Sequence, residues 1–398
     1  MKKNAVIGQS GGPTSVINSS LAGIVQACTA SSQIDSVYGM NFGIEGFMQE
    51  KLIDLSVLGQ PLIDGLKKTP SSALGSSRHK VQDADFPKIL DVLKKFDIHY
   101  FFLIGGNDTM DTIHRVEAYC RDKKYELTGV GVPKTVDNDL YGTDHTPGWA
   151  SAARYNMLSV LQGGRLAKDM QRVDRFVIYQ TIGRDAGWLA AAAGLAKKNP
   201  DDAPHLIYIP ERKFNDEAFL ENARTCVKNY GWVSVVCGEG IRYGDGTPVS
   251  QSKTKDKFSN TEFGAMGGSS AALNLHRMLT QKCNWRGEFQ IIESLNMCAF
   301  DRASTVDLEE AFSCGKKAVS FAEEGLSGVM VSIKRISDNP YKIELTHVPL
   351  SDVAVRAKPM PDEFISENGC GITPAFEAYA RPLTGSLPEY YEIPKKYI

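Results

Sequence analysis

The chain has 398 residues and a formal net charge of -2. Because a single hydrophobic core stops growing near about 250–300 residues, this length predicts two domains. The near-neutral charge, without a stripe of Lys and Arg interleaved with aromatic residues, argues against nucleic acid as a partner. The chain begins Met1-Lys2-Lys3 and enters a strand pattern at once, and no long apolar segment follows, so we expect neither a signal peptide nor a membrane span.

The eight cysteines are scattered along the chain, and none forms a CxxC pair or another metal-binding cluster. Several lie within apolar helix or strand patterns, which is typical of buried thiols. Reduced thiols of this kind are the rule in cytosolic proteins. We therefore expect the protein to be cytoplasmic.

The first element is an apolar strand over residues 4–9, which leads into Ser10-Gly11-Gly12-Pro13-Thr14 and a helical pattern over residues 16–29. Glycine allows a ligand to approach the backbone closely, and the free N–H groups of a helix start favour an anion such as phosphate. The turn is neither GxGxxG nor a P-loop, so an ordinary tight turn explains it equally well. A strand over 36–40 and a helix over 61–68 follow.

A loop of small residues over 69–78 ends in Arg78, whose planar guanidinium could cover a phosphate, although surface arginines are at least as common. A helix over 86–96 and an apolar strand over 99–104 come next. That strand ends in Gly105-Gly106-Asn107-Asp108, a second glycine turn at a strand's carboxyl end. A carboxylate there is a helix cap, a magnesium ligand or a charge that rejects extra phosphates.

The most concentrated set of polar groups follows the apolar strand over residues 127–132 and reads Pro133-Lys134-Thr135-Val136-Asp137-Asn138-Asp139. Open α/β sheets bind their ligands at the carboxyl ends of strands. An amine, a hydroxyl and two carboxylates within seven residues are costly to gather unless a charged ligand or metal balances them. A solvated loop with a helix cap is the alternative explanation.

A third junction of this kind follows a long helix predicted over residues 143–170. The strand over 175–180 leads into Ile182-Gly183-Arg184 and a helix of small residues over 185–197. Arg184 is thereby placed as a clamp for a phosphate. Three such junctions in one chain are hard to attribute to chance.

The rest of the chain continues the alternation of strands and helices, with strands predicted over 205–209, 232–237, 289–293, 329–333 and 341–347 and helices over 217–230 and 306–324 and from 264 onward. Glu239 stands between two glycines after a strand. Residues 243–260 indicate an excursion or loop, and the tail from Lys358 indicates a wrapping segment. This alternation predicts an α/β protein with two doubly wound, Rossmann-like lobes.

Taken together, these stretches resemble the phosphofructokinase family, and more closely its pyrophosphate-dependent branch. ATP-dependent members carry GGDGS and PGTIDND, whereas pyrophosphate-dependent members carry GGDD and PKTIDND. Here the two stretches read Gly105-Gly106-Asn107-Asp108 and Pro133-Lys134-Thr135-Val136-Asp137-Asn138-Asp139. The other matches, in family order, are Ser10-Gly11-Gly12 through Asn18, Leu74-Gly75-Ser76-Ser77-Arg78, Ile182-Gly183-Arg184 and Ile209-Pro210-Glu211.

The resemblance implies phosphofructokinase-type lobes with the active site in the cleft between them. It assigns residues 1–142 plus about 266–335 to a donor lobe, and residues 143–265 plus about 336–398 to a sugar-phosphate lobe with its wrapping tail. Pyrophosphate and a sugar phosphate are then the substrates, Mg²⁺ is the cofactor, and neither nucleic acid nor membrane is a partner.

The resemblance also implies roles for single residues. Asp137 is the base for the sugar's 1-hydroxyl, and Lys134 and Arg184 stabilise the moving phosphoryl group. Asp108 excludes ATP, and Asn107 stands where the family has a magnesium-binding aspartate. The donor is implied to contact Gly12, Arg78 and Gly106, and the acceptor Thr135, Asp137, Asp139, Arg175, Ile182, Gly183, Arg184 and Glu239. Because Arg175 matches an arginine that reaches a neighbouring subunit, we expect a homodimer or homotetramer.

One position departs from the family pattern. Met297 stands where the family has an arginine that holds the sugar 6-phosphate. Either Arg302, Lys257 or another cation replaces it, or the acceptor differs, or the chain is a divergent, non-catalytic or regulatory member. The leading expectation is reversible transfer from pyrophosphate to fructose 6-phosphate, as in glycolysis. The alternative acceptor is another sugar phosphate such as sedoheptulose 7-phosphate.

Overall fold

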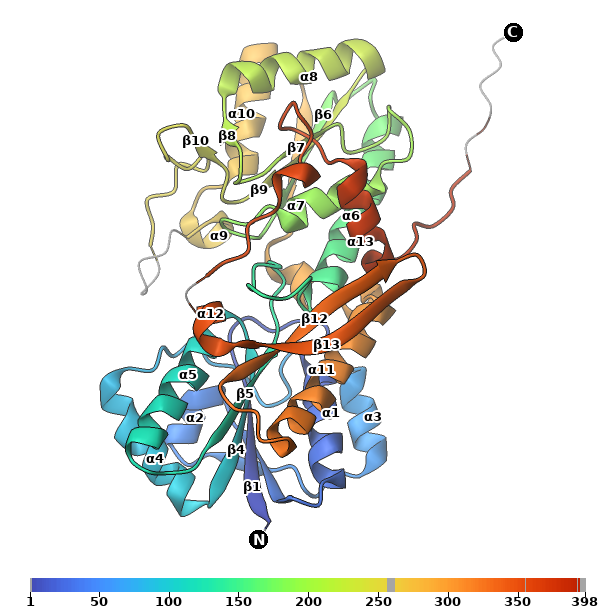
Figure 1. Cartoon of the computed structure of the whole chain (residues 1–398). Coiled ribbons are helices and arrows are strands. Elements are labelled where there is room, and N and C mark those ends of the chain that lie inside the picture. Colours follow the sequence, from blue (N-terminus) through green and yellow to red (C-terminus); the bar gives the residue numbers. More distant parts are fainter. Residues whose placement is uncertain (1, 256–261, 355, 392, 394–398) are drawn as a thin grey trace.

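The computed structural model describes residues 2–255, 262–354, 356–391 and 393, and they form two α/β lobes (Figure 1). The first lobe contains a seven-stranded sheet in the order β13-β12-β5-β4-β1-β2-β3. Its strands are β1 (Lys3–Gln9), β2 (Ile34–Met40), β3 (Leu52–Asp54), β4 (Ile98–Gly105), β5 (Thr128–Pro133), β12 (Val329–Asp338) and β13 (Tyr341–Pro349). The strands from β2 to β12 run parallel, and β3 and β13 are antiparallel at the two edges.

Helices cover both faces of this sheet because its central strands are apolar on both sides. In β4, Phe102 and Ile104 belong to one buried cluster, and Phe101 and Leu103 belong to the other. The helices of the first face are α1 (Ile17–Ala30), α3 (Gln60–Lys67) and α11 (Thr305–Glu323). Those of the second face are α2 (Gly43–Met48), α4 (Phe86–Lys95), α5 (Asn107–Asp122) and α12 (Leu350–Ala354).

The second lobe contains a four-stranded parallel sheet in the order β11-β6-β9-β7. Its strands are β6 (Phe176–Thr181), β7 (Leu206–Tyr208), β9 (Val233–Gly238) and β11 (Gly287–Ile291). One face packs against α6 (Trp149–Asp169), α7 (Trp188–Ala193) and α13 (Pro374–Thr384), and the other against α8 (Asp216–Tyr230) and α10 (Ala271–Cys283). The smaller elements are β8 (Lys213–Phe214), β10 (Arg242–Tyr243), α9 (Gly264–Gly267) and the short helices Asp83–Asp85, Gly194–Ala196, Glu293–Met297, Phe300–Arg302 and Asp362–Phe364.

The two-lobed, doubly wound architecture is confirmed, but the predicted division of the chain is wrong in its second half. Residues from about 266 were assigned to the first lobe, yet α10 and β11 belong to the second, where β11 pairs with β6. Residues from about 336 were assigned to the second lobe, yet β13 pairs with β12 at the edge of the first sheet. Strand pairing joins segments that are distant in sequence, so no local pattern indicated which sheet each strand enters.

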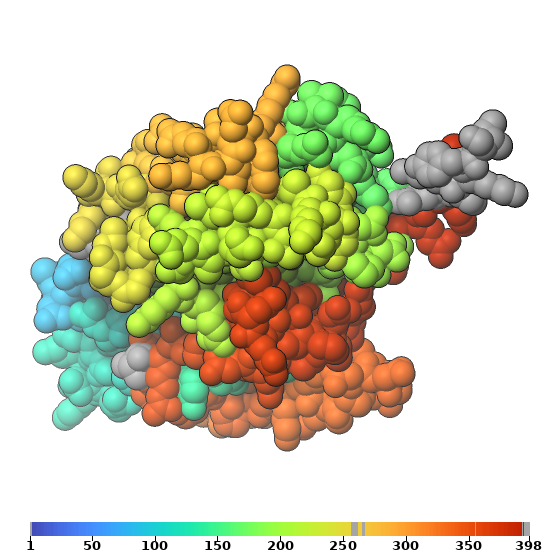
Figure 2. Space-filling view, turned by 90° about the horizontal axis from the view of Figure 1, so that it is seen from above, coloured from blue at the N-terminus to red at the C-terminus, as the bar shows by residue number. Residues whose placement is uncertain are grey.

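The C-terminal segment contacts both lobes, whereas the sequence assigned it, as a wrapping segment, to the sugar-phosphate lobe. Lys358 N–H donates to the Asp139 carbonyl of the first lobe, and Ile207 N–H of β7 donates to the Cys370 carbonyl. Figure 2 shows this segment, in red, between the orange chain of the first lobe and the yellow-green chain of the second. The tail also contains a helix that the sequence did not indicate, α13, which packs against α6.

Two further expectations concern thiols and membranes. All eight cysteines are free thiols, and six of them are buried, as predicted. Among the described residues, no helix has the length and apolar character that crossing a membrane requires.

Candidate active site

The candidate site is built on the turns that follow β1, β4 and β5 in the first lobe and β6 and β9 in the second. Asp137, after β5, lies close enough to Glu239 and Arg184 of the second lobe for both charges to affect its proton affinity. The turn after β1 meets the chain that follows β11, because Ser15 Oγ donates to the Met297 carbonyl at 3.3 Å. The three predicted junctions therefore converge between the lobes.

Asp137 has the proton affinity of a general base. Burial is the main reason that its pKa is raised to about 7, and the neighbouring carboxylates Asp139 and Glu239 act in the same direction. The positive charges of Lys134 and Arg184 oppose the rise. A carboxylate that titrates near neutrality can take a proton from a hydroxyl and release it again. Burial also raises the pKa of Asp139.

Lys134 connects the ends of two strands. Its side chain is 4% exposed, and its Nζ donates to the Gly12 carbonyl at 2.7 Å. Burial lowers the pKa of Lys134 to about 8, while the charge of Asp137 opposes this change. The ammonium thus lies between the turn after β1 and the carboxylate after β5, where it can contact a phosphoryl group passing between them.

The glycine turn after β1 is crowded. A Cβ atom on Gly12 would lie 2.6 Å from Met297 Cε and 4.0 Å from an Arg78 guanidinium nitrogen. Met297, expected at the sugar end of the site, therefore contacts the turn expected to hold the donor. The exposed Arg78 lies near enough to Lys134 to lower its pKa further.

The second lobe supplies a carboxylate that organises a turn. Glu239 Oε1 accepts the N–H groups of Gly183 at 3.2 Å and Arg184 at 3.0 Å. Arg184 has a φ of 47°, and a Cβ on Gly240 would lie 1.7 Å from the Arg184 carbonyl oxygen, so only glycine fits there. Burial raises the pKa of Glu239, and the charge of Glu293, which the sequence did not single out, adds to the rise.

The turn after β4 contains the predicted metal ligand. Gly106 precedes α5, and the buried Oδ1 atom of Asn107 has no hydrogen-bond partner. The exposed carboxylate of Asp108 lies 3.4 Å from Lys80 Nζ. Among the described residues, no group of three or more His, Cys, Asp or Glu side chains could hold a metal ion. An unpaired amide oxygen fits Mg²⁺ only where phosphate oxygens and water complete the coordination, which is how Mg²⁺ usually binds with phosphates.

Two predicted cations lie outside this cluster. Arg175 precedes β6, at the opposite end of the strand from Arg184, and donates to the Gly231 carbonyl at 2.9 Å. Arg302 donates to Ser159 Oγ at 2.7 Å and to Gln162 Oε1 at 3.1 Å, so it is held against α6. Lys257 lies outside the described residues.

Comparison with known proteins agrees with the architecture. The family described as Phosphofructokinase matches residues 4–288. The chain is 38% identical to the pyrophosphate–fructose 6-phosphate 1-phosphotransferase of Halomonas elongata, over 96% of this chain and 91% of that protein.

The chain belongs to the phosphofructokinase family.

Within this family, the chain is also 33% identical to the sulfofructose kinase of Alkalicoccus urumqiensis, over 91% of each protein. Among solved structures, the pyrophosphate-dependent phosphofructokinase from Marinobacter aquaeolei matches with a TM-score of 0.87 at 36% identity. That match covers 98% of this chain and 94% of the other.

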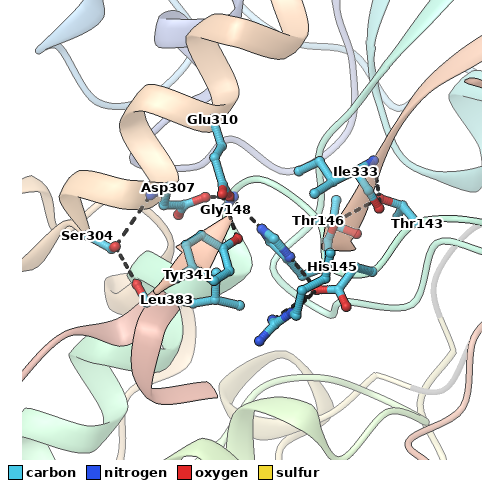
Figure 3. A network of polar contacts seen from close by, with 12 residues as sticks. Thr143, His145, Thr146, Gly148, Ser304, Asp307, Glu310, Ile333, Tyr341 and Leu383 are labelled. Atoms are coloured by element: carbon cyan, nitrogen blue, oxygen red, sulfur yellow. Dashed lines mark hydrogen bonds and ion pairs between the residues drawn. The ribbon is translucent and has the colours of Figure 1, made fainter. Parts of the chain in front are cut away.

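In this phosphofructokinase-family chain, a buried polar network supports the loop after Asp139 (Figure 3). His145 is fully buried and contacts Asp144 Oδ2 at 2.7 Å and Glu310 Oε2 at 2.5 Å. Burial alone would lower the pKa of His145, but the two carboxylates outweigh it and the pKa is raised. Sequence reasoning missed this network, because Glu310 is on α11, far from His145 along the chain.

Asp307 belongs to the same region and caps α6. Its carboxylate accepts the N–H groups of Gly148 and Ser151, both at 2.9 Å, and the Ser151 hydroxyl at 2.6 Å. A carboxylate at a helix amino terminus accepts hydrogen bonds from the free N–H groups, and its negative charge interacts favourably with the positive end of the helix dipole. Because Asp307 lies on α11, this contact fixes the start of the 21-residue helix α6 against the first lobe.

Proposed function

We propose that the chain transfers a phosphoryl group reversibly from pyrophosphate to the 1-hydroxyl of fructose 6-phosphate, giving fructose 1,6-bisphosphate and phosphate, as in glycolysis. The observation that carries the proposal is that buried Lys134 lies close enough to Asp137 for each charge to affect the other, and the Asp137 pKa of about 7 suits a base. The name of the Halomonas elongata relative supports the same donor and acceptor.

The proposed mechanism assigns each group one task. The Asp137 carboxylate accepts the proton of the sugar's 1-hydroxyl as that oxygen attacks the terminal phosphorus and the bond to the leaving phosphate breaks. The ammonium of Lys134 and the guanidinium of Arg184 stabilise the negative charge on the equatorial oxygens. In the reverse direction Asp137 returns the proton. The transfer is reversible because the phosphoryl potential of pyrophosphate is close to that of the product.

The donor side is proposed to select pyrophosphate over ATP. The backbone of Gly12 and Gly106 and the guanidinium of Arg78 would bind pyrophosphate, while Asp108 would repel the α-phosphate of a nucleotide. Asn107 Oδ1 would hold Mg²⁺ together with phosphate oxygens. The ion would neutralise charge on the phosphates.

The acceptor side is proposed to use Glu239 and the turn at Ile182-Gly183-Arg184, with Thr135 and Asp139 holding the catalytic loop. Arg175 lies at the opposite end of β6 from this turn, which suits contact with a neighbouring subunit's sugar phosphate. We therefore propose a homodimer or homotetramer. The eight free thiols suit a reducing compartment, so the proposed location is the cytoplasm.

A second acceptor is favoured by one feature of the acceptor side. The charge of Glu293 lies near Glu239, and Met297, where the family carries a phosphate-binding arginine, contacts the donor turn and supplies no cation. A sulfonate carries a single negative charge and needs fewer cations than a phosphate dianion. The name of the Alkalicoccus urumqiensis relative makes sulfofructose the substrate to compare.

The deciding experiment is a matrix of donors and acceptors with the purified chain and Mg²⁺. Pyrophosphate and ATP are each offered with fructose 6-phosphate, sedoheptulose 7-phosphate and sulfofructose, and kcat/KM is measured for every pair. We expect the highest value for pyrophosphate with fructose 6-phosphate. Greater turnover with ATP would refute the donor assignment, and a preference for another sugar would refute the acceptor.

A further inference from the structure

The loop that carries Asp137 is held from behind by the C-terminal segment. Asn138, between Asp137 and Asp139, is fully buried and has a φ of 56°, a left-handed conformation that non-glycine residues seldom adopt. Its Oδ1 accepts the Thr146 N–H at 3.0 Å. Asparagine tolerates this conformation better than most other non-glycine residues, and here hydrogen bonds to its buried side chain hold it in place. The contacts of the Asn138 side chain therefore decide where its two acidic neighbours point.

Lys358 supplies one set of these contacts. Its Nζ donates to the Asp144 carbonyl at 2.7 Å, the Thr143 carbonyl at 3.2 Å and Asn138 Oδ1 at 3.4 Å. Its backbone N–H donates to the Asp139 carbonyl at 2.7 Å. One residue of the tail thus binds the Asn138 side chain and three backbone carbonyls of the loop that follows it. All of these acceptors are uncharged. The ammonium also lies near enough to Asp139 for its positive charge to oppose the rise in the pKa of that carboxyl.

Tyr379 supplies the other set. Its hydroxyl accepts Asn138 Nδ2–H at 3.0 Å and donates to the Asp144 carbonyl at 2.9 Å. Its ring packs against Trp149 and Trp188, with ring centroids 5.7 and 5.5 Å away. Because the aromatic packing fixes the ring, the hydroxyl is a rigid support for the Asn138 amide.

We propose that Lys358 and Tyr379 are positioning residues for phosphoryl transfer, which act through Asn138 to hold the carboxylates of Asp137 and Asp139 in their reactive geometry. The inference rests on the proposed function, because it assumes that Asp137 is the base. Neither side chain contacts the reacting groups themselves. Misplacing a catalytic group by 1 Å can cost about a hundredfold in rate, so loosening the support lowers kcat.

The alternative is that the two residues only attach the tail to the body of the protein. Loss of a purely structural contact would lower the thermal midpoint and leave kcat of the folded protein unchanged. A positioning role instead lowers kcat while pyrophosphate binding persists. The hydrogen bonds described for Lys358 and Tyr379 do not reach the donor turn after β1, so their loss leaves that turn intact. The ratio of the effects on kcat and KM separates the two explanations.

The test uses the full chain with pyrophosphate and fructose 6-phosphate. Tyr379→Phe removes one oxygen atom, and Lys358→Met removes the ammonium and keeps most of the stem. For each variant we expect kcat to fall about tenfold or more while KM for pyrophosphate changes less than about twofold. The matched controls are Tyr119→Phe and the exposed Lys334→Met, for which we expect the wild-type kcat.

The double variant tests whether both residues act on the same group. Since both hold Asn138, the loss of kcat in the Tyr379→Phe, Lys358→Met double variant should be smaller than the product of the single losses. Thermal midpoints are measured for all variants, and if Lys358→Met does not fold, Tyr379→Phe alone carries the test.

Wild-type kcat in the folded Tyr379→Phe variant would overturn the inference. A loss of kcat in the double variant equal to the product of the two single losses would also overturn it, because the residues would then act independently. An inactive wild-type chain would instead refute the proposed function.

Discussion

Replacing the proposed base should make the protein more stable as well as inactive. The pKa of Asp137 is about 7 in the folded protein, against an ordinary value of 3.8. A raised carboxyl pKa means that the folded state binds the proton more tightly than the unfolded state. The resulting destabilisation of the folded state begins above the Asp137 pKa of the unfolded chain, grows as the pH rises, and is complete above about pH 7.

The size of the effect follows from the shift. About three pKa units at about 1.4 kcal/mol each give an upper limit of about 4 kcal/mol above pH 7. Because the Asp137 side chain remains partly exposed, we expect about 2 kcal/mol of this to be observed. Asp137→Asn has nearly the same shape and no charge, so it avoids the cost. We therefore expect this variant to be more stable at pH 8, with a smaller difference at pH 4.

The assay measures the thermal midpoint of wild type and Asp137→Asn at both pH values, together with turnover of pyrophosphate and fructose 6-phosphate. Loss of a general base lowers the rate by about 10²–10⁴-fold. Asp91→Asn, an exposed carboxylate on α4, is the matched control and should change neither quantity measurably. Wild-type turnover in Asp137→Asn, or an unchanged midpoint at pH 8, would refute the reasoning.

Three further outcomes are expected. The kcat/KM of the wild type should rise with pH through about 7, as Asp137 loses its proton, and fall above about 8, as Lys134 loses its charge; a flat profile between pH 6 and 9 would contradict these roles. Asp108→Gly should increase kcat/KM for ATP relative to pyrophosphate, and an unchanged ratio would remove Asp108 from donor selection. Asp307→Ala leaves two N–H groups of the α6 amino terminus without their acceptor, and should destabilise the chain by about 3 kcal/mol in denaturant unfolding, whereas the exposed Glu367→Gln should not.

The central strands and the polar turns at their carboxyl ends could be predicted from the residues alone. An apolar run followed by glycine and charge is a local signal, so the turns at Gly105-Gly106, Lys134 and Arg184 could be predicted without knowledge of the fold. The proximity of the turns at Gly105-Gly106 and Lys134 also followed, because parallel strands place their carboxyl ends at one edge of a sheet. The turn at Arg184 belongs to the other sheet, so its place beside them depended on how the lobes face each other. The predicted candidates Lys134, Asp137 and Glu239 do lie together.

Features that depend on contacts between distant parts of the chain could be seen only in the folded protein. The sheet that β11 and β13 enter, the contact of Met297 with Gly12 and the support of Asn138 by Lys358 and Tyr379 all join segments with no local relation. Burial is equally a property of the assembled fold. It is the largest contribution to the raised pKa of Asp137 and the lowered pKa of Lys134, and so it converts ordinary charged side chains into groups that titrate near neutrality.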